Sequence, residues 1–325
     1  STTVARAIEE AGARLGEEVR VNLEVVRTHG DVSAAPLAAL GGVGVFAAQL
    51  RLALLGGECD LAVHSFKDLP TAPTPGLRIA AVPQREDPRD ALCAADGVTL
   101  ASLPEGALVG TGSPRRAAQV LAARPDLVVC DLRGNVPTRL SRVRGLDLGA
   151  DAGTAPSALG TGERLDAVVL ALAGLRRIGL DAHATDVLDP AIMMPAPSQG
   201  ALAIETRDEE DPLLRALLGT LHHRPTALAA SAERAVLSAL GAGCAAPVGA
   251  FARVDEASSV LLLDARVMSV DGCERVEASG SLALTDSVGL DEAARLGEDV
   301  ARQLLAGGAA EVTDLGATKA PRQSS

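Results

Sequence analysis

The chain has 325 residues, 47% of them apolar, which is enough for two or three domains with packed cores. No run of about 18 uncharged apolar residues occurs, which argues against a membrane span. Acidic residues outnumber basic ones by 42 to 30, the net charge is −12, and there are three Phe and no Trp or Tyr. A surface that binds nucleic acid usually has a basic face and aromatic side chains on which bases stack. The composition therefore argues against nucleic-acid binding, although it allows a local basic cleft.

Cysteine usage predicts a reduced, cytosolic compartment, because the five cysteines are odd in number and form no CxxC motif. They are Cys59, Cys93, Cys130, Cys244 and Cys273. No His lies at metal-ligand spacing from them, so no metal site is expected. The chain begins with Ser1, directly on a helical pattern and without signal-peptide regions, and we expect a few residues to be missing at its start.

The first quarter of the chain predicts an α/β unit. Apolar spacing indicates a helix ending at Leu15, with Thr2 or Thr3 as a cap, and then a strand from about Val19 to Arg27. Further elements are a Gly-rich turn at 41–44, a helix to about residue 55, and buried strands at 60–64 and 77–82. Strand, helix and strand in this order favour a parallel sheet.

A second α/β unit follows a charged, Pro-bracketed stretch at 83–90, which is typical of a hinge between domains. Its predicted elements are strands at 107–110, 127–132 and 166–172, with helices at 114–123 and 136–143. The Gly/Ala/Asp/Ser stretch at 144–163 predicts a mobile surface insertion. Residues 195–200 look like a second crossing between domains, followed by a strand at 201–206.

The third unit begins near His222 and has mixed character. Its predicted elements are a long helix at 226–240, antiparallel strands at 247–254 and 260–267, and an amphipathic helix at 291–305. We therefore expect two doubly wound α/β domains of the periplasmic-binding-protein type with a double crossover, plus a small α+β domain. The expected domains are 1–84 with 200–219, then 85–199, then 220–325.

Basic residues follow three successive strands of the second unit. Ser113 is predicted as a helix N-cap with Pro114 in the first turn, and Arg115 and Arg116 come directly after it. Arg139 falls one turn into the next helix, and the pair Arg176–Arg177 follows the third strand. Because the carboxyl ends of parallel strands share one sheet edge, these groups favour a ligand with several carboxylates or phosphates. The alternative to ligand binding is that these arginines are solvated side chains on ordinary capped helices.

Two other segments carry candidate chemistry. Ser65, Lys67 and Asp68 follow a buried strand, where Lys67 could grip a carboxylate while Asp68 exchanges a proton with a substrate. A structural Lys–Asp ion pair is the commoner reading of such neighbours. Cys244 lies in a Gly-rich loop after a long helix, which favours exposure, although a lone cysteine is more often a small buried apolar residue.

Taken together, seven segments resemble the porphobilinogen deaminase (hydroxymethylbilane synthase) family. They are residues 63–70 (VHSFKDLP), 85–90 (REDPRD), 110–116 (GTGSPRR), 132–136 (LRGNV), 173–177 (AGLRR), 195–201 (PAPSQGA) and 243–247 (GCAAP). They occur in order over about residues 30–250. Two departures stand out: the chain lacks the family's initial Thr-Arg-x-Ser strand, and Ala39 and Val43 stand where many members have lysines.

The resemblance implies a transferase of tetrapyrrole and haem biosynthesis that condenses four porphobilinogens, releasing ammonia, and then frees hydroxymethylbilane. It implies a dipyrromethane cofactor attached to Cys244 through a thioether, and Asp68 as the catalytic residue. The residues it implies for cofactor and substrate binding are Ser65, Lys67, Ser113, Arg115, Arg116, Arg139, Arg177 and Gln199. We expect a cytoplasmic enzyme, monomeric, with porphobilinogen as its small-molecule partner and neither nucleic acid nor membrane.

Two alternatives from other classes remain open. A non-catalytic binding protein of the periplasmic type would share the double crossing and the arginine-lined cleft, but it would need neither Cys244 nor Asp68. A thiol enzyme would use Cys244 as a recycling nucleophile, although no His is placed by sequence to serve as its base. A dipyrromethane adduct on Cys244 would distinguish the porphobilinogen deaminase interpretation from both alternatives.

Overall fold

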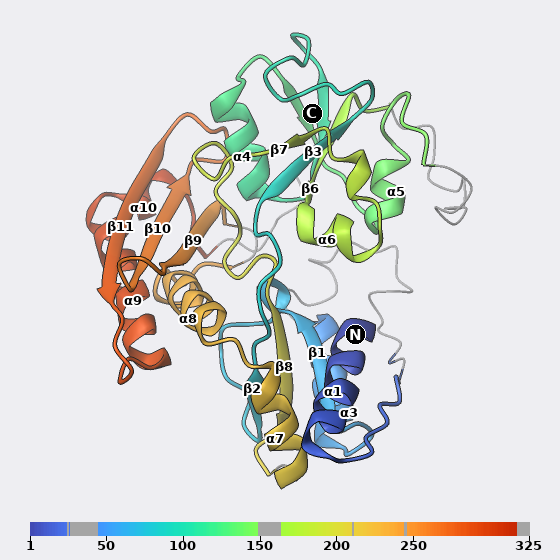
Figure 1. Ribbon diagram of the computed structural model, residues 1–325. Coiled ribbons are helices and arrows are strands. Elements are labelled where there is room, and N and C mark those ends of the chain that lie inside the picture. Colours follow the sequence, from blue (N-terminus) through green and yellow to red (C-terminus); the bar gives the residue numbers. More distant parts are fainter. Residues whose placement is uncertain (25, 27–44, 149–163, 210, 244–245, 317–325) are drawn as a thin grey trace.

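The chain forms three β-sheets, each with its own helices (Figure 1). The computed structural model describes residues 1–24, 26, 45–148, 164–209, 211–243 and 246–316. The predicted turn at 41–44 and most of the predicted insertion at 144–163 lie outside these residues. No helix within the described ranges is long and apolar enough to cross a membrane.

The first sheet has three strands in the order β1-β8-β2. These strands are β1 (Leu61–Ser65), β8 (Leu202–Arg207) and β2 (Leu77–Ala81), and β8 pairs antiparallel with both neighbours. The prediction of a parallel sheet here was wrong, because β8 returns from far along the chain and inserts between the two earlier strands. Helices α1 (Thr2–Leu15) and α7 (Pro212–Leu221) cover one face, and α3 (Val45–Leu55) covers the other.

The second sheet has five strands in the order β5-β4-β6-β3-β7. They are β3 (Asp90–Ala94), β4 (Leu108–Gly110), β5 (Val128–Cys130), β6 (Ala167–Ala171) and β7 (Asp186–Val187). As predicted, β4 is parallel to β5 and β6, whereas β3 is antiparallel to β6. One face packs against α4 (Pro114–Ala123), and the other against α5 (Val136–Leu140) and α6 (Leu172–Arg177).

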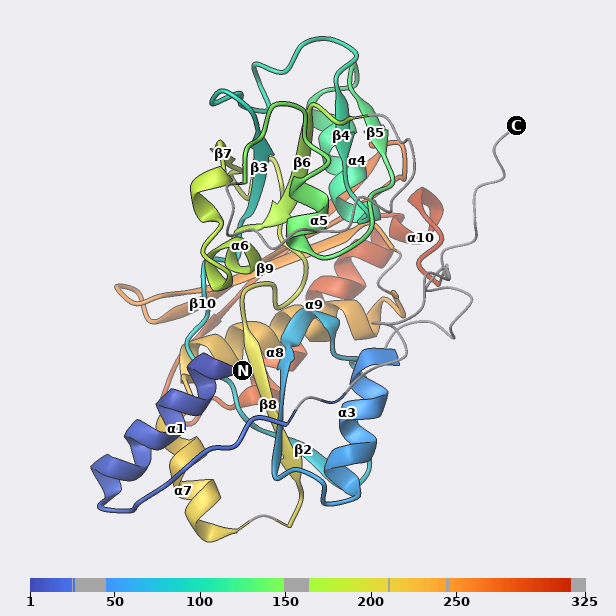
Figure 2. The same cartoon turned by 90° about the vertical axis from the view of Figure 1, so that its right-hand side faces the viewer.

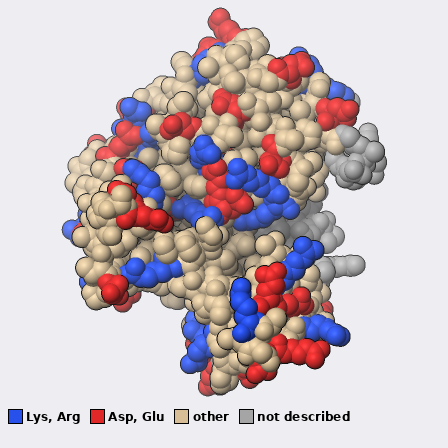
Figure 3. Space-filling model, in the orientation of Figure 1, with Lys and Arg blue, Asp and Glu red and all other residues tan. Residues whose placement is uncertain are grey.

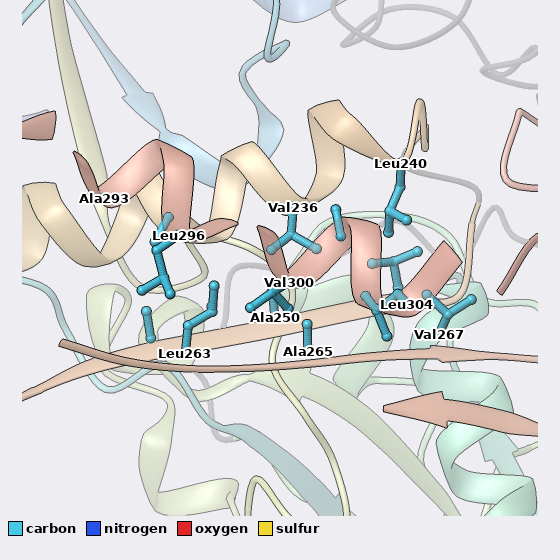
Figure 4. Packing of buried hydrophobic residues seen from close by; sticks show 14 of the residues in the cluster. Val236, Leu240, Ala250, Leu263, Ala265, Val267, Ala293, Leu296, Val300 and Leu304 are labelled. Atoms are coloured by element: carbon cyan, nitrogen blue, oxygen red, sulfur yellow. The ribbon is translucent and has the colours of Figure 1, made fainter. Parts of the chain in front are cut away.

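The third sheet is an antiparallel meander in the order β11-β10-β9. Its strands are β9 (Val248–Asp255), β10 (Val260–Met268) and β11 (Arg275–Ala283). Helices α8 (Arg224–Ala239) and α9 (Leu290–Ala306) lie on one face, and α10 (Ala309–Val312) follows α9. Val236, Leu263, Val300 and Leu304 meet between the helices and the sheet (Figure 4). This apolar layer fixes α8 against the sheet.

Two chain segments connect the first and second sheets, as predicted. Residues 82–89 lead from β2 to β3, and residues 188–201 lead from β7 back to β8. They run side by side, since the Glu86 amide donates to the Gly200 carbonyl over 3.3 Å. Gly200 has a φ of +89°, and a Cβ there would overlap the Glu86 carbonyl oxygen, so this close approach requires glycine. The fold therefore has the predicted double crossover and a separate α+β unit.

One predicted strand is absent from the described chain. Residues 19–24 are extended but pair with no strand, and the Val21 amide donates instead to the Glu9 carboxylate of α1 over 3.0 Å. The apolar side chains of Val19 and Val21 still pack on the core beside α1. The alternating apolar pattern that predicted a strand therefore reflects burial of one face of this segment, whose backbone pairs with no described strand.

Candidate active site

A short 3₁₀ turn, η2 (Phe66–Asp68), carries the predicted Lys–Asp pair at the end of β1. Phe66 is buried, and its amide donates to the Ala201 carbonyl over 3.1 Å, which ties the turn to the second crossing. Lys67 Nζ donates to Gln199 Oε1 over 3.3 Å, and the Asp68 side chain is exposed. We call residues 65–68 the catalytic turn.

Lys67 has an unusually low pKa for a lysine. Burial lowers the pKa of its ammonium group to about 8; neighbouring Asp68 opposes this shift, and the positive charge of Arg116 adds to it. A lysine in this state is charged at neutral pH but weakly hydrated. Such an ammonium group gains more from an incoming carboxylate than a solvated lysine does.

The predicted pair Arg115 and Arg116 lies at the start of α4, where Ser113 is the N-cap and Pro114 follows it. Both guanidinium groups are buried and bind Asp90, at 2.8 Å each, and Arg115 also donates to the Met194 carbonyl. Asp90 is fully buried at the start of β3. The two arginines therefore form a buried ion-pair cluster, which the sequence reading did not foresee.

Gln199 connects that cluster to the catalytic turn. Its Nε2 donates to Asp90 Oδ1 over 2.8 Å, while its Oε1 accepts from Lys67 and, at 3.4 Å, from Arg116. Burial disfavours the Asp90 carboxylate, but Arg115 and Arg116 outweigh burial and lower its pKa to about 2. Asp90 stays ionised at all physiological pH values, and it holds the arginines and Gln199 in fixed geometry.

Arg139 and Arg177 differ from the buried pair. Arg139, on α5, donates to the Gly134 carbonyl over 2.7 Å, and Arg177, on α6, donates to the Gly200 carbonyl at 3.1 Å and to Ser65 Oγ at 3.5 Å. Among the described residues neither guanidinium forms an ion pair with a carboxylate. Their positive charge is thus available to an anionic ligand.

Electrostatics confirm that these groups are neighbours. Burial lowers the pKa of both Arg139 and Arg177, and in both cases Asp68 is among the charges that oppose this shift. In Figure 3, Lys and Arg side chains gather in the middle of the molecule, between the lobes formed by the first and second sheets. The structure therefore brings the catalytic turn, Gln199 and the arginines of three helices to one place.

Cys244, the predicted cofactor residue, lies outside the described residues. The described chain resumes at Ala246, and Gly243 donates its amide to the Leu315 carbonyl at 3.4 Å. None of the other four cysteines forms a disulfide in the described part of the chain. Burial raises the pKa of Cys93 to about 12, which makes it unreactive.

Three further groups support the site and were missed from sequence. Glu233 on α8 accepts from Arg85 at 2.7 Å and from the Ser198 amide at 2.5 Å, so it holds both crossings. Arg234, next to it, binds the carbonyl oxygen of Phe66 in the catalytic turn and those of Leu69 and Pro70 just after it. His64 and Glu205 pair at 3.1 Å beneath that turn. Single acidic or basic residues in a helical pattern give no sign of such distant partners.

A cavity of about 560 Å³ lies elsewhere, between the outer face of the third sheet and residues 189–194. Its arginines are already paired, Arg253 with Asp264 at 2.7 Å and Arg266 with Glu277 at 2.6 Å. It contains none of the predicted site residues. Among the described residues no group of His, Cys, Asp or Glu could hold a metal ion.

Known proteins of one family match this chain over most of its length. The family profile described as "Porphobilinogen deaminase, dipyromethane cofactor binding domain" matches residues 1–215, and "Porphobilinogen deaminase, C-terminal domain" matches residues 227–306. Relatives named porphobilinogen deaminase include those of Cutibacterium acnes, 53% identical over 96% of this chain and 94% of the relative, and Leifsonia xyli, 53% identical over 91% and 86%.

A third relative of the same name, from Thermobifida fusca, is 47% identical over 94% of this chain and 90% of its own length. Among solved structures, a Bacillus subtilis lipoprotein described as methionine-binding aligns over 69% of this chain and 87% of its own. That alignment has a TM-score of 0.39 and 13% identity, too loose to support an inference. The family membership therefore rests on the sequence relatives and the profiles, which span nearly all of the chain. The chain belongs to the porphobilinogen deaminase family.

Proposed function

We propose that the chain is a working hydroxymethylbilane synthase. It joins four porphobilinogen molecules head to tail, releases one ammonia for each, and frees hydroxymethylbilane by hydrolysis. The observation that carries the proposal is the meeting of the Lys67–Asp68 turn with Arg139 and Arg177, neither of which forms an ion pair with a described carboxylate. Each porphobilinogen brings two carboxylates, so a growing chain needs concentrated positive charge in an otherwise acidic protein.

Asp68 has the role of the catalytic carboxylate. It is exposed at the end of the catalytic turn, where its negative charge stabilises the positive charge that develops as the aminomethyl group loses ammonia. It also accepts hydrogen bonds from pyrrole N–H groups and takes part in proton transfer. Lys67 and Ser65, on the same turn, bind the acetate and propionate groups.

The arginines divide between two roles. Arg139 and Arg177 bind substrate carboxylates directly, since their described partners are carbonyl and hydroxyl oxygens only. The buried cluster around Asp90 holds Arg115, Arg116 and Gln199, and its two cations against one anion give the site a fixed net positive charge. At the start of α4, Ser113 offers its hydroxyl to the ligand.

The residues present fit a dipyrromethane group, because Arg139 and Arg177, which form no described ion pair, can bind its carboxylates. We propose that Cys244 carries it through a thioether, with Lys67, Arg139 and Arg177 binding its acetate and propionate side chains. When bound, the group supplies the pyrrole carbon to which the first substrate is joined. A thiolate is a good nucleophile for forming such a link, and a thioether resists hydrolysis through repeated turnovers.

The wider arrangement is also part of the proposal. The three sheets support a division into domains at 1–84 with 200–219, at 85–199 and at 220–325. The lack of a disulfide among the four described cysteines supports a reducing, cytoplasmic setting. We propose a monomer, because all of the described groups of the site come from one chain.

Intact-protein mass spectrometry tests the proposal. Protein incubated with porphobilinogen should exceed its sequence mass by one dipyrromethane, on the peptide that contains Cys244, and it should form four ammonia per hydroxymethylbilane. Cys244→Ser should lack the adduct, while the matched control Cys273→Ser, an exposed thiol, should keep it. An unmodified Cys244 together with tight porphobilinogen binding would favour a binding protein instead.

A further inference from the structure

Arg234 on α8 holds the catalytic turn from outside the site. Its Nη1 donates to the carbonyls of Phe66 at 3.1 Å and Leu69 at 2.9 Å, and its Nη2 donates to the Pro70 carbonyl at 2.6 Å. The guanidinium also lies over the Phe66 ring, 4.5 Å from its centroid. One side chain from the third unit thus contacts the first unit at four points around Asp68.

These contacts meet a specific need of the turn. A single 3₁₀ turn leaves the carbonyl groups at and after its end without partners inside the turn. Arg234 donates charge-assisted hydrogen bonds to two carbonyls that follow the turn, of Leu69 and Pro70, and to the Phe66 carbonyl, which also accepts from the Leu69 amide. The stacked Phe66 ring fixes the plane of the guanidinium. A lysine could not reproduce this arrangement, because a single ammonium lacks the fork that spans three carbonyls.

The neighbouring residue gives α8 a second fixed connection. Glu233 is fully buried and accepts from Arg85 of the first crossing, from the Ser198 amide of the second crossing, and from Ala252 on β9 at 2.7 Å. Consecutive residues of one helix therefore hold both crossings and the catalytic turn. The same helix ends at Ala239, five residues before Cys244.

We propose that Arg234 is a positioning residue for the reaction: it sets the place and orientation of Asp68 relative to α8, the helix that leads into the cysteine loop. The inference rests on the proposed function only where activity is measured. Arg234 touches neither substrate nor cofactor; it acts through the backbone of residues 66–70. Its loss should lower the catalytic step, because Asp68 is displaced, and should weaken substrate binding less, because Lys67 and Ser65 share the turn but Arg139 keeps its described partner.

The test compares Arg234→Ala with Arg224→Ala. Arg224 is the matched control: it lies on the same helix and donates to two carbonyls, of Thr285 and Val288, but these are far from the turn. We expect kcat to fall about 100-fold in Arg234→Ala, with KM changed only a few-fold, as for misplacement of a catalytic group. Arg224→Ala should keep wild-type kcat. Millimolar guanidinium chloride, against the same concentration of sodium chloride, should partly restore Arg234→Ala.

Hydrogen exchange supplies a readout that does not need activity. Peptides covering residues 64–70 should exchange faster in Arg234→Ala than in wild type and Arg224→Ala. If Arg234→Ala does not fold, Arg234→Lys is measured in its place and should show the same faster exchange. Normal kcat with unchanged exchange, or an equal loss of kcat in Arg224→Ala, would overturn the proposal. A wild-type protein that makes no hydroxymethylbilane would contradict the proposed function, while the exchange comparison would still decide the role of Arg234.

Discussion

Lys67 and Gln199 face each other where the first sheet meets the second, with Nζ of the lysine donating to Oε1 of the glutamine over 3.3 Å. Through the other end of its amide, Gln199 reaches Asp90 at 2.8 Å. A single uncharged side chain thus links the catalytic turn to the buried arginine cluster. A shift of one sheet relative to the other would therefore break at least one of these two hydrogen bonds.

Replacing Gln199 with Leu should therefore affect stability and activity together. The change leaves buried Asp90 without one donor and Lys67 without its acceptor, at a cost of about 1–3 kcal/mol in unfolding free energy. Urea denaturation measures the cost, and kcat should fall because the turn loses one tether. Gln303→Leu, on the exposed side of α9, is the control and should change stability by no more than about 0.5 kcal/mol. Equal stability of the two variants would contradict this role for Gln199.

Asp68→Asn should fold normally and turn over slowly. The asparagine keeps the shape of an exposed side chain but removes the charge that stabilises the developing cation, so kcat should fall by about 10²–10³-fold. Steady-state kinetics with porphobilinogen measures the loss, and intact mass should still show the cofactor on Cys244. Near-normal turnover would remove Asp68 from the mechanism.

Arg116→Leu and Arg139→Leu should separate structural from ligand-binding arginines. Arg116→Leu breaks a buried ion pair with Asp90 and should cost about 3 kcal/mol, whereas Arg139→Leu leaves no described carboxylate unpaired and should cost about 0.5 kcal/mol or less. Both should stall chain growth. Native mass spectrometry of the enzyme–substrate intermediates would show where it stops, and normal elongation in Arg139→Leu would refute its contact with the ligand.

The pH profile should show the titration of Lys67. Because its folded pKa is about 8, the ammonium loses its charge as pH rises through 8, and kcat/KM should fall there. Lys67→Arg should move this alkaline limb upward. The unfolded chain binds more protons between pH 8 and 10.5, so this group makes the folded state more stable as pH rises across that window. An alkaline limb unchanged in Lys67→Arg would assign it to another group.

The site was more predictable than the sheets that build it. Motifs next to strand ends predicted that Arg139 and Arg177 lie close together, because β5 and β6, which precede them, both run parallel to β4 and end at one edge of the sheet. Lys67 follows a strand of the antiparallel first sheet, so this rule does not account for its position. Asp90 was taken as part of a hinge, since the charges before it hide a five-residue strand that is buried throughout. β11 was missed although its residues alternate between exposed and half-buried, because the small residues Ala278 and Gly280 occupy two of its four half-buried positions and weaken the apolar pattern.

Long-range pairing explains the remaining errors. Nothing in residues 61–81 shows that a strand from residues 202–207 will lie between β1 and β2, so the local order of elements suggested a parallel sheet. The partners of Glu233 and Arg234 are also remote: Arg85 is 148 residues from Glu233, and Leu69 is 165 residues from Arg234. The pattern and spacing of residues along the sequence indicate local structure. Contacts between residues so far apart in the sequence are determined only by the assembled fold.

The central place of β8 also imposes an order on synthesis. β1 and β2 are complete by residue 81, but the strand that both pair with begins at residue 202, about 120 residues later. At roughly 5–20 residues per second, the nascent chain carries two unpaired strands for about 6–24 s. The five-stranded sheet can close during this interval, since its strands β3 to β7 all precede β8. Of these two sheets, the one that carries Asp68 therefore closes later on the ribosome, and until β8 is made the edges of β1 and β2 are open to pairing with other chains.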